Sequence, residues 1–537
     1  MGFLRVGVQL LLSLSLHQHM TAHVQATCAS VAVQCPSRKV RDELGPLLSD
    51  GAAIVLPSDD AWDELTARAS SPRVRPNYLA IVEVATESDV QNTVRHDPKR
   101  LCYWYREYLE LTRPGRQIKV ANKLDLPFLA VSGAHGWPST INRVKDGIQI
   151  SMRRMNQTTI HPDGNIATAG GGILQHTFTS ALWEQNKRAV TGLCECVSTI
   201  GPLLGGGHSM LQGKHGFAAD NLVSARLVLA DGKAVTVSET ENRDLFWAVR
   251  GAGHNFGIVT SFDVKVYDAK DSEWTIISFT FNQDKLEDVF TAWNKLEDEN
   301  PDRGLLLVNG VINRSPDADP HHPIINVQLI YEGENDSVGA FAAAFRALDP
   351  ISDSTESNIS WGNLYDTGGF GLESPVCRKN ENILGYPNSF TRWDIAGLRR
   401  AYDVFADITA DETFATSAWL LESFGQAGVT AVPESANAVA PEERRRHLLT
   451  SPSFWWKGSS KDDAKKVAWY GEKMQKTMRP KGGSGEMAQP HSYVNYAKGG
   501  ESLGEMYGRD TGRLHRLREL KRKWDPQNRF GFYAPIH

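Results

Sequence analysis

The sequence predicts an α+β fold in two parts, and three features of the chain carry this prediction. From 40 to 270, short apolar runs and helical stretches alternate between glycine turns. From 275 to 345, strand-like runs alternate with helical ones, which favours an antiparallel sheet with helices on one face. A strongly basic helix, 512–524, follows near the C-terminus and ends at Asp525-Pro526. A chain of 537 residues is long enough for two or three globular regions.

Turn and breaker residues bound the elements of the first part. Asp50-Gly51 opens a strand that Pro57 ends, and Thr86–Asp89 is typical of a capped helix start. Asp231-Gly232 predicts a hairpin between its flanking strands. The expected strands are 52–56, 79–84, 126–131, 166–169, 222–230, 234–237 and 258–262, and the expected helices are 174–185 and 244–249.

The second part is expected to contain strands 275–281, 304–312 and 324–331 and helices 286–296 and 338–348. Residues 350–490 look less regular and rich in loops. We place domain boundaries at 27–272, 273–488 and 489–537, after a removable segment 1–26.

One segment, 96–117, interrupts a helix that would otherwise run from Ser88 into Ala121. It carries Cys102, Trp104 and three tyrosines. Two interpretations stay open: an atypical surface insertion, or a translated intron or other gene-model error. The second predicts a poorly packed excursion.

The N-terminus has the pattern of a secretory signal peptide. Arg5 precedes an apolar run, 6–16, and Val24-Gln25-Ala26 resembles a cleavage site. The run is too short to span a bilayer, and no later segment is apolar enough. We therefore expect the secretory pathway or the extracellular space and no membrane span; a buried N-terminal helix is the alternative. The net charge of -5 gives no support for nucleic-acid binding.

Six cysteines are present, and Cys28 with Cys35 is the first pair expected if the chain meets an oxidising compartment. The cysteine spacing fits no zinc template, so no metal site is expected. N-glycosylation sequons occur at Asn156, Asn313, Asn335 and Asn358, which would make the secreted chain a glycoprotein.

Small residues surround a histidine in the loop Ser132-Gly133-Ala134-His135-Gly136. Such a loop lets backbone N–H groups converge on an anion, for which a pyrophosphate is the natural ligand. A plain tight turn is the alternative. A lone histidine in a loop, such as His135, is usually solvent-exposed or merely hydrogen bonded. Imidazole is also nucleophilic at neutral pH, however, and can add to the electron-poor methyl group of a flavin.

Cys194 precedes a second glycine-rich stretch that ends in Gly205-Gly206-Gly207-His208. A thiolate is a stronger nucleophile than an imidazole. The alternatives for Cys194 are a buried apolar role or a disulfide. Cys194-Glu195-Cys196 has C-x-C spacing with no second pair, which argues against a metal or redox centre.

A dinucleotide site of the Rossmann type is not predicted at Gly251–Gly257. The third glycine comes one position late, and the order is helix, loop, strand. No G-x-S-x-G, H-E-x-x-H or P-loop motif occurs.

At these residues the chain resembles the berberine-bridge-enzyme-like FAD-linked oxidoreductases of the vanillyl-alcohol-oxidase (PCMH) superfamily. Its motif sequences are most similar to those of members from fungal secondary metabolism. The resemblance covers most of the chain outside about 275–485. It is carried by 127–136, 169–172, 192–194, 205–208, 220–222, 230–232, 242–248, 250–260, 493–496, 507–508 and 524–526.

The resemblance implies a two-domain PCMH-type fold, in which 27–272 binds FAD, 273–488 binds substrate and 489–537 returns to the FAD domain. It implies a bond from His135 to the flavin 8α carbon and a second from Cys194 to flavin C6. Two departures from the family pattern are Ala134, in place of a glycine, and Glu195-Cys196, in place of a proline-containing stretch. The implied cofactor contacts are His135, Cys194, Ser132, Gly133, Ala134, Gly136, Gly201, Gly257, Ile258, Val259 and Asn495.

The expected activity is oxidation of a small molecule, with hydride transfer from a C–H bond to flavin N5 and reoxidation by O2 to H2O2. Tyr493 and Tyr496 are the candidates for the base or for orienting substrate, and packing beside the ring is their alternative role. The competing functions are a flavin dehydrogenase with a non-O2 acceptor, a carbohydrate oxidase, and a flavin-fold binding protein without turnover. The substrate pocket is expected within 275–485.

Overall fold

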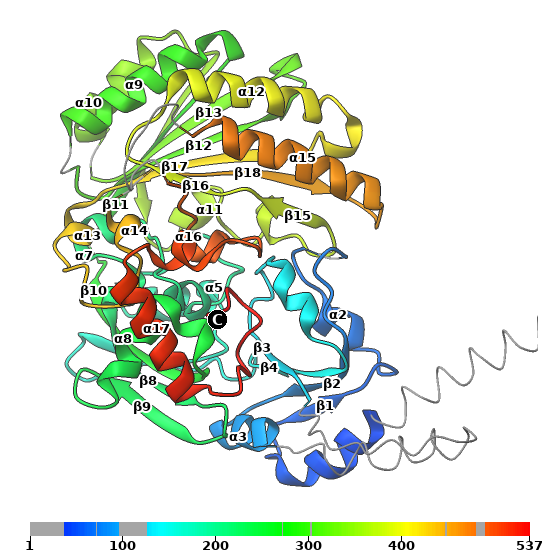
Figure 1. Cartoon of the computed structure of the whole chain (residues 1–537). Helices are drawn as coiled ribbons and strands as arrows, with labels where there is room; N and C mark the ends of the chain where they lie inside the picture. Colours follow the sequence, from blue (N-terminus) through cyan, green and yellow to red (C-terminus); the bar gives the residue numbers. More distant parts are fainter. Residues whose placement is uncertain are drawn as a thin grey trace, which may run out of the picture.

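Three β-sheets organise the chain, which we describe from a computed structural model (Figure 1). The structure describes residues 37–70, 72–95, 126–270, 272–300, 303–333, 335–445, 448–479 and 489–537. The predicted segments 1–26 and 96–117, and the predicted Cys28–Cys35 pair, lie outside these residues. The mixed helix and sheet content confirms the α+β class.

The first sheet has four strands in the order β1-β2-β4-β3. Strands β2 and β3 run parallel to β4, whereas β1 is antiparallel to β2. Because both faces of β2 and β4 are covered, their residues are almost all buried, as parallel strands require. The bounds are β1 Ala53–Val55, β2 Tyr78–Glu83, β3 Phe128–Val131 and β4 Gly147–Ser151, with helices α2 Trp62–Thr66 and α3 Glu87–Arg95.

The second sheet is antiparallel and has six strands. The predicted hairpin is confirmed, because β8 and β9 pair on either side of Asp231-Gly232, and Gly232 has a φ of 76°. The strands are β5 Thr158–Ile160, β6 Ile166–Gly170, β7 Lys187–Ala189, β8 Leu222–Val228, β9 Ala234–Ser238 and β10 Ile258–Asp268. The helices are α5 Gln175–Trp183, α6 Ile200–Leu204, α7 Gln212–His215 and α8 Arg243–Ala252.

The third sheet is antiparallel, with eight strands in the order β14-β11-β13-β12-β17-β18-β15 and β16 beside β18. Helices α9, α10, α12 and α15 cover one face (Figure 1), of which the sequence predicted α9 and α10. Trp293 of α9, Phe405 of α12 and Trp419 of β17 lie in the core between them. The strands are β11 Glu273–Phe281, β12 Leu306–Ser315, β13 Asp319–Glu332, β14 Ser352–Ser360, β15 Asn382–Gly385, β16 Asn388–Phe390, β17 Ala418–Phe424 and β18 Leu448–Trp456. The helices are α9 Leu286–Glu299, α10 Asn335–Arg346, α11 Leu364–Thr367, α12 Ile395–Thr409, α13 Ala427–Thr430, α14 Pro441–Arg445 and α15 Lys461–Thr477.

The prediction of irregular structure in 350–490 is wrong. This region supplies five strands of the third sheet and both long helices α12 and α15. Strand β14 is almost wholly exposed and polar, so it lacks the apolar alternation that signals a strand. Strand β18 is buried throughout, so it lacks alternation for the opposite reason.

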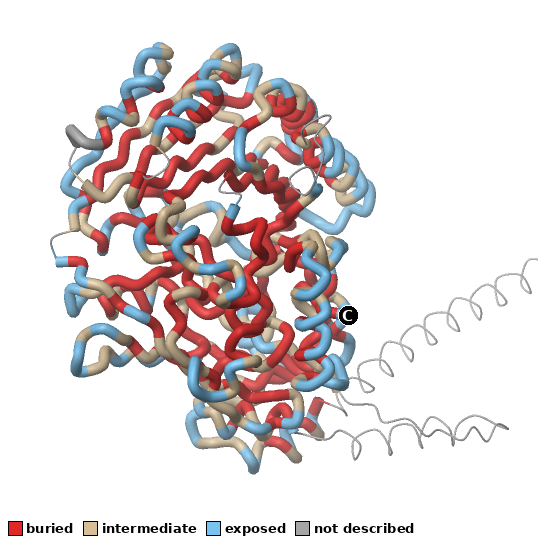
Figure 2. Tube along the Cα trace, turned by 60° about the vertical axis from the view of Figure 1, so that its left-hand side comes forward, coloured by how far each residue is buried: buried red, intermediate tan, exposed pale blue. Residues whose placement is uncertain are grey.

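The two parts of the chain share a core. Ile276, Leu307 and Phe424 of the third sheet pack in the same apolar cluster as the second sheet. Figure 2 shows the buried segments continuing from one sheet to the next, with exposed residues on the outer faces of the helices. This continuity fixes the relative position of the sheets, and hence of any site between them.

The C-terminal segment packs on the second sheet's helices. Helix α17 (Thr511–Trp524), preceded by α16 (Leu503–Tyr507), lies beside α8 (Figure 1). Lys521 Nζ donates to the Asn255 carbonyl oxygen over 2.9 Å, and Asn255 Oδ1 accepts from the Ile536 N–H over 3.0 Å. The end of the chain is thereby tied to the loop after α8.

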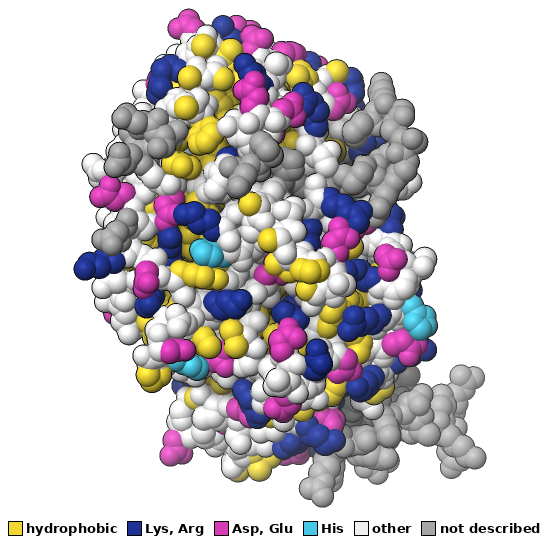
Figure 3. Space-filling view, turned by 90° about the vertical axis from the view of Figure 1, so that its left-hand side faces the viewer, with side chains coloured by type: hydrophobic (Ala, Val, Ile, Leu, Met, Phe, Trp, Pro, Cys, Tyr) yellow, Lys and Arg dark blue, Asp and Glu magenta, His cyan; other side chains and the backbone are white. Residues whose placement is uncertain are grey.

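The surface carries charges of both signs. On the face in Figure 3, basic and acidic side chains are interspersed, and Lys214 pairs with Glu332 over 2.6 Å. Among the described residues, no helix combines the length and apolarity needed to cross a bilayer.

A buried ion pair joins α14 to the glycine-rich segment of the first part. Arg444 Nη2 lies 2.6 Å from Asp220 Oδ1, and Arg444 Nη1 lies 3.0 Å from Asp220 Oδ2. Both side chains are 2–3% exposed, so each charge depends on the other.

We expect Arg444→Met to lower the free energy of unfolding by about 3–5 kcal/mol, because it leaves the Asp220 carboxylate buried and unpaired. Urea unfolding followed by tryptophan fluorescence measures the loss. Arg445→Met is the matched control, since the Arg445–Glu434 pair is about 40% exposed and we expect a loss of about 1 kcal/mol or less. Equal losses of unfolding free energy in the two variants would contradict the larger contribution of the buried Arg444–Asp220 pair.

Candidate functional site

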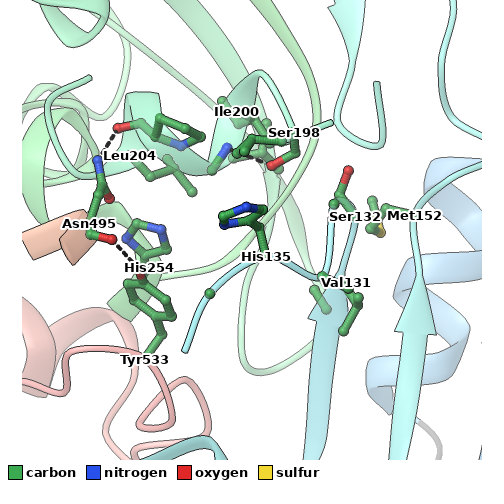
Figure 4. A pocket seen from close by; sticks show the side chains of 18 of the residues that line it. Val131, Ser132, His135, Met152, Ser198, Ile200, Leu204, His254, Asn495 and Tyr533 are labelled. Atoms are coloured by element: carbon green, nitrogen blue, oxygen red, sulfur yellow. Dashed lines mark hydrogen bonds between the residues drawn. The ribbon is translucent and has the colours of Figure 1, made fainter. Parts of the chain in front are cut away.

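A cavity of about 330 Å³ lies where the first two sheets meet the third sheet and the C-terminal segment. Figure 4 shows His135 within it, with His254 and Tyr533 to one side and Val131 and Ser132 to the other. Every site residue predicted from the sequence lines this cavity: Ser132, Gly133, Ala134, His135, Gly136, Cys194, Gly201, Gly257, Ile258, Val259, Tyr493, Asn495 and Tyr496.

The loop after β3 follows the backbone of the cysteine-bearing segment closely. A Cβ on Gly133 would lie 2.7 Å from Ser198 N and 3.2 Å from the Cys196 carbonyl oxygen, so only glycine permits this approach. Ser132 Oγ donates to the Gly172 carbonyl oxygen over 2.8 Å. Ala134 has a φ of 56°, a left-handed conformation that costs a non-glycine residue on the order of 1 kcal/mol.

His135 has one free nitrogen. Its Nε2 lies 2.8 Å from the carbonyl oxygen of Val376, and a carbonyl only accepts, so Nε2 carries the proton. Burial lowers the pKa of His135 below its usual value, although the bond to Val376 opposes this effect. The ring is therefore neutral near pH 7, with a lone pair on Nδ1.

Cys194 is a free, half-buried thiol. Burial and the Glu422 carboxyl group raise its pKa to about 12, so the thiol keeps its proton at neutral pH. The neighbouring Cys196 forms a disulfide with Cys377, with Cα atoms 5.7 Å apart. The sequence did not indicate this pairing, because the two cysteines are 181 residues apart and share no motif.

Tyr496 donates its hydroxyl proton to Glu422, a residue that the sequence analysis missed. Tyr496 Oη lies 2.9 Å from Glu422 Oε2. Burial raises the pKa of Glu422, and burial together with Glu422 raises that of Tyr496 well above its usual value. The sequence signal was an acidic residue in the largely apolar strand β17.

Tyr493 has the opposite role in its hydrogen bonds. Its hydroxyl oxygen accepts from Gly207 N–H (3.0 Å), His208 N–H (3.3 Å) and Asn495 Nδ2 (2.6 Å). Asn495 Nδ2 also donates to the Pro202 carbonyl oxygen over 2.8 Å, which fixes the orientation of this amide. Tyr493 thus holds the positive-φ turn at Gly206-Gly207 in place.

A buried His–Glu–His cluster lies behind Tyr493, and the sequence analysis missed it as well. His208 Nε2 lies 3.2 Å from Glu443 Oε1, and its Nδ1 lies 2.9 Å from Gln212 Oε1, which also accepts the Ser209 N–H. Both ring nitrogens of His208 therefore lie within hydrogen-bond distance of a side-chain oxygen. His491 Nε2 bonds the other oxygen of Glu443 over 2.7 Å. Burial opposes ionisation of Glu443, but the two imidazoles lower its pKa to about 2.

Three further cavity residues keep polar atoms without a partner: Arg68, Gln175 and His254. Arg68 Nη2 donates to the Gly136 carbonyl oxygen over 3.0 Å, but its Nε and Nη1 have no acceptor. Burial lowers the pKa of Arg68 and lowers that of His254 to about 4. Buried polar atoms without partners indicate a polar ligand, and the two Arg68 donors suit an anionic one. Among the described residues, no group of three or more His, Cys, Asp or Glu could hold a metal ion.

The chain matches two protein families and several curated proteins. Residues 116–238 match the FAD binding domain family, and residues 492–537 match the berberine and berberine-like family. FAD-linked oxidoreductase chry5 of Gibberella zeae is 35% identical over 527 residues, covering 96% of this chain and all of the relative. FAD-linked oxidoreductase anuG of Penicillium roqueforti is 34% identical over 515 residues, covering 95% of this chain and 94% of the relative.

Solved structures share the fold at low sequence identity. Xylooligosaccharide oxidase from Myceliophthora thermophila is 22% identical, with a TM-score of 0.72 over 92% of this chain and 99% of that structure. Physcomitrella patens BBE-like 1 is 20% identical, with a TM-score of 0.71 over the same shares. The cavity residues, the two domain matches and the relatives together show that this chain belongs to the berberine-bridge-enzyme-like FAD-linked oxidoreductases.

Proposed function

We propose that this oxidoreductase is an oxidase that holds FAD through bonds to His135 and Cys194 and uses Tyr496 with Glu422 to accept the substrate's proton. One observation carries the proposal. An imidazole with a free Nδ1, a free thiol and a tyrosine bonded to a buried carboxylate all line the same cavity.

The residues of the cavity fit FAD. Arg68 offers two unpartnered N–H groups to an anion such as the pyrophosphate, and the loop of small residues 132–136 lines the same cavity. His135 would bond the flavin 8α carbon and Cys194 would bond C6. Gly201, Gly257, Ile258, Val259 and Asn495 would add contacts along the same wall.

When bound, FAD accepts a hydride equivalent from a substrate C–H bond and passes the electrons to O2 as H2O2. The chain's own residues manage the proton. Tyr496 takes the proton of a substrate O–H or N–H group while its own proton moves to the Glu422 carboxylate. Tyr493 orients the site, because its oxygen already accepts three N–H groups. Phe424 lines the cavity and, like Tyr493, packs against His208, so an apolar ring helps to exclude water on this side.

The substrate we propose is a small molecule of fungal secondary metabolism, as the resemblance in sequence implies; the relatives chry5 and anuG, which are named as FAD-linked oxidoreductases, also come from fungi. The electron acceptor we propose is O2, and a dehydrogenase with another acceptor is the competing assignment. Anaerobic reduction of the flavin by substrate, followed by admission of air, distinguishes them by the rate of reoxidation and by H2O2 release.

A carbohydrate substrate is a second candidate, favoured by polar side chains beside Glu422. Asn309 lies opposite Glu422 and opposite Gln328 in the third sheet, so the three residues share one face. Asn309 Nδ2 donates to Gln328 Oε1 over 3.1 Å. Amide groups in such a row suit a substrate rich in hydroxyl groups.

We also propose that the chain enters the secretory pathway. The apolar run 6–16 after Arg5 supports this, as does the Cys196–Cys377 disulfide, because disulfides persist in oxidising compartments. Asn156 and Asn358 of the sequons are exposed.

Covalent attachment predicts the mass of the denatured chain. We expect the parent chain to carry one FAD, His135→Ala and Cys194→Ser each to retain it through the remaining bond, and the double variant to lose it on acid precipitation. Mass spectrometry and the colour of the pellet are the measurements. A parent chain that releases all its flavin into the acid supernatant would refute attachment.

The Tyr496–Glu422 pair predicts an acid limb in the pH profile. Only the carboxylate can accept the Tyr496 proton, so flavin reduction should rise with pH through a midpoint above 4.5, since burial raises the pKa of Glu422. Glu422→Gln should remove this limb and slow reduction by about 10²–10⁴-fold, and Tyr496→Phe should slow it similarly. Anaerobic stopped-flow reduction tests this, with Tyr493→Phe as the comparison of smaller effect. An unchanged limb in Glu422→Gln would exclude this role.

The third prediction of the proposed function is that Arg68 contributes to the affinity for FAD. In the His135→Ala/Cys194→Ser background, Arg68→Gln should weaken FAD binding about 10- to 100-fold, because hydrogen bonds to a charged group are lost. Arg73→Gln is the matched control, since Arg73 is half-buried and bonds the adjacent Trp137 carbonyl but does not line the cavity. Titration of apoprotein with FAD measures both. Equal losses of FAD affinity in the two variants would mean that Arg68 affects binding only by supporting the 132–136 loop, whose Gly136 carbonyl it contacts.

A further inference from the structure

We propose that the Cys196–Cys377 disulfide is a positioning device for flavin attachment: it holds the Val376 carbonyl against His135 and so keeps Nδ1 as the free nitrogen. This inference rests on the proposed attachment at His135. The disulfide follows Cys194 by two residues on one side and Val376 by one residue on the other. It therefore links the segments that serve both proposed attachment residues.

The segment that carries Val376 lies at the surface and contains no strand. It passes through a single 3₁₀ turn, η6 (Pro375–Cys377), and residues on either side of Val376 are exposed, Leu372 by 44%. Its backbone bonds to the rest of the fold are few. Phe370 O accepts from Glu195 N–H over 3.0 Å, and Asn380 N–H donates to Arg68 O over 2.9 Å.

The disulfide lies between these two bonds and constrains the part of the segment that contacts His135. The Val376 side chain packs only partly, beside Ile383 and Trp455. Without the S–S bond, a short exposed loop of this kind would sample several backbone positions. Its carbonyl would then contact His135 for only part of the time.

The carbonyl matters because a neutral imidazole carries one proton on either nitrogen. The bond from Nε2–H to Val376 keeps that proton away from Nδ1. No other acceptor is hydrogen bonded to Nε2 among the described residues. When the carbonyl moves away, the tautomer with a protonated Nδ1 gains population, and that nitrogen is no longer a nucleophile.

The test compares attachment rates in a Cys194→Ser background, where all covalent flavin must be at His135. Chains are purified from riboflavin-starved cells, FAD is added, and the fraction of denatured chain carrying its mass is followed with time. Cys196→Ser/Cys377→Ser should attach FAD at least about tenfold more slowly, the scale expected when a reacting group is misplaced. Glu373→Ala, an exposed change in the same loop, should keep the parent rate.

Two further measurements separate positioning from general damage. In ¹⁵N spectra of the imidazole, the parent should show His135 protonated on Nε2, whereas the double serine variant should show a mixture of tautomers. The non-covalent affinity for FAD, measured with His135→Ala added, should be the same with and without the disulfide.

If the double serine variant does not fold, dithiothreitol added to the folded parent replaces it. One dithiol reduces the S–S bond to two thiols and becomes a cyclic disulfide, and attachment should slow by the same factor. Equal attachment rates and an unchanged tautomer after removal or reduction would overturn the proposal. A Cys194→Ser parent that forms no acid-stable flavin would overturn it too, but by refuting attachment at His135 itself.

Discussion

The site depends on one close contact, the approach of the Gly133 backbone to residues 196–198. A side chain at 133 would collide with Ser198 N, so the loop after β3 could not lie against the cysteine segment. With glycine there, His135 and Cys194 open onto one cavity although they lie on loops that follow strands of different sheets. The Val376 carbonyl bonds His135 and the Tyr496–Glu422 pair lies at the same cavity, which both proposed attachment residues line.

The buried ionisable groups differ in whether another charged group of the protein balances them. Some of them are balanced within the protein: Arg444 pairs with Asp220, and Glu443 lies between two imidazoles, of which that of His208 lines the cavity. In or beside the cavity, Arg68 and Glu422 have no ion-pair partner among the described residues. Burial lowers the pKa of Arg68 and raises that of Glu422, and both shifts favour the neutral form of the group. Groups held in this condition are suited to a ligand's charge and to a substrate's proton.

The sequence predicted those elements whose residues carry a local signal. Asp231-Gly232 has the turn chemistry of a hairpin, and the small residues around His135 have the pattern of an anion loop. Glu422, Val376 and Cys377 were missed for a physical reason: each acts through a contact made far along the chain, Val376 through its backbone alone. Strand β14 was missed because it is neither buried nor alternating.

The two tyrosines of the motif Tyr493-Val494-Asn495-Tyr496 illustrate the same limit at closer range. The sequence makes them equivalent candidates, yet their oxygens differ in what surrounds them. Three N–H donors converge on Tyr493, so its oxygen has no lone pair to offer a substrate proton while it keeps its own. Tyr496 donates into Glu422, so its proton has a destination when another arrives. These contacts support the proposal that Tyr496 transfers the proton, whereas Tyr493 maintains the turn at Gly206-Gly207.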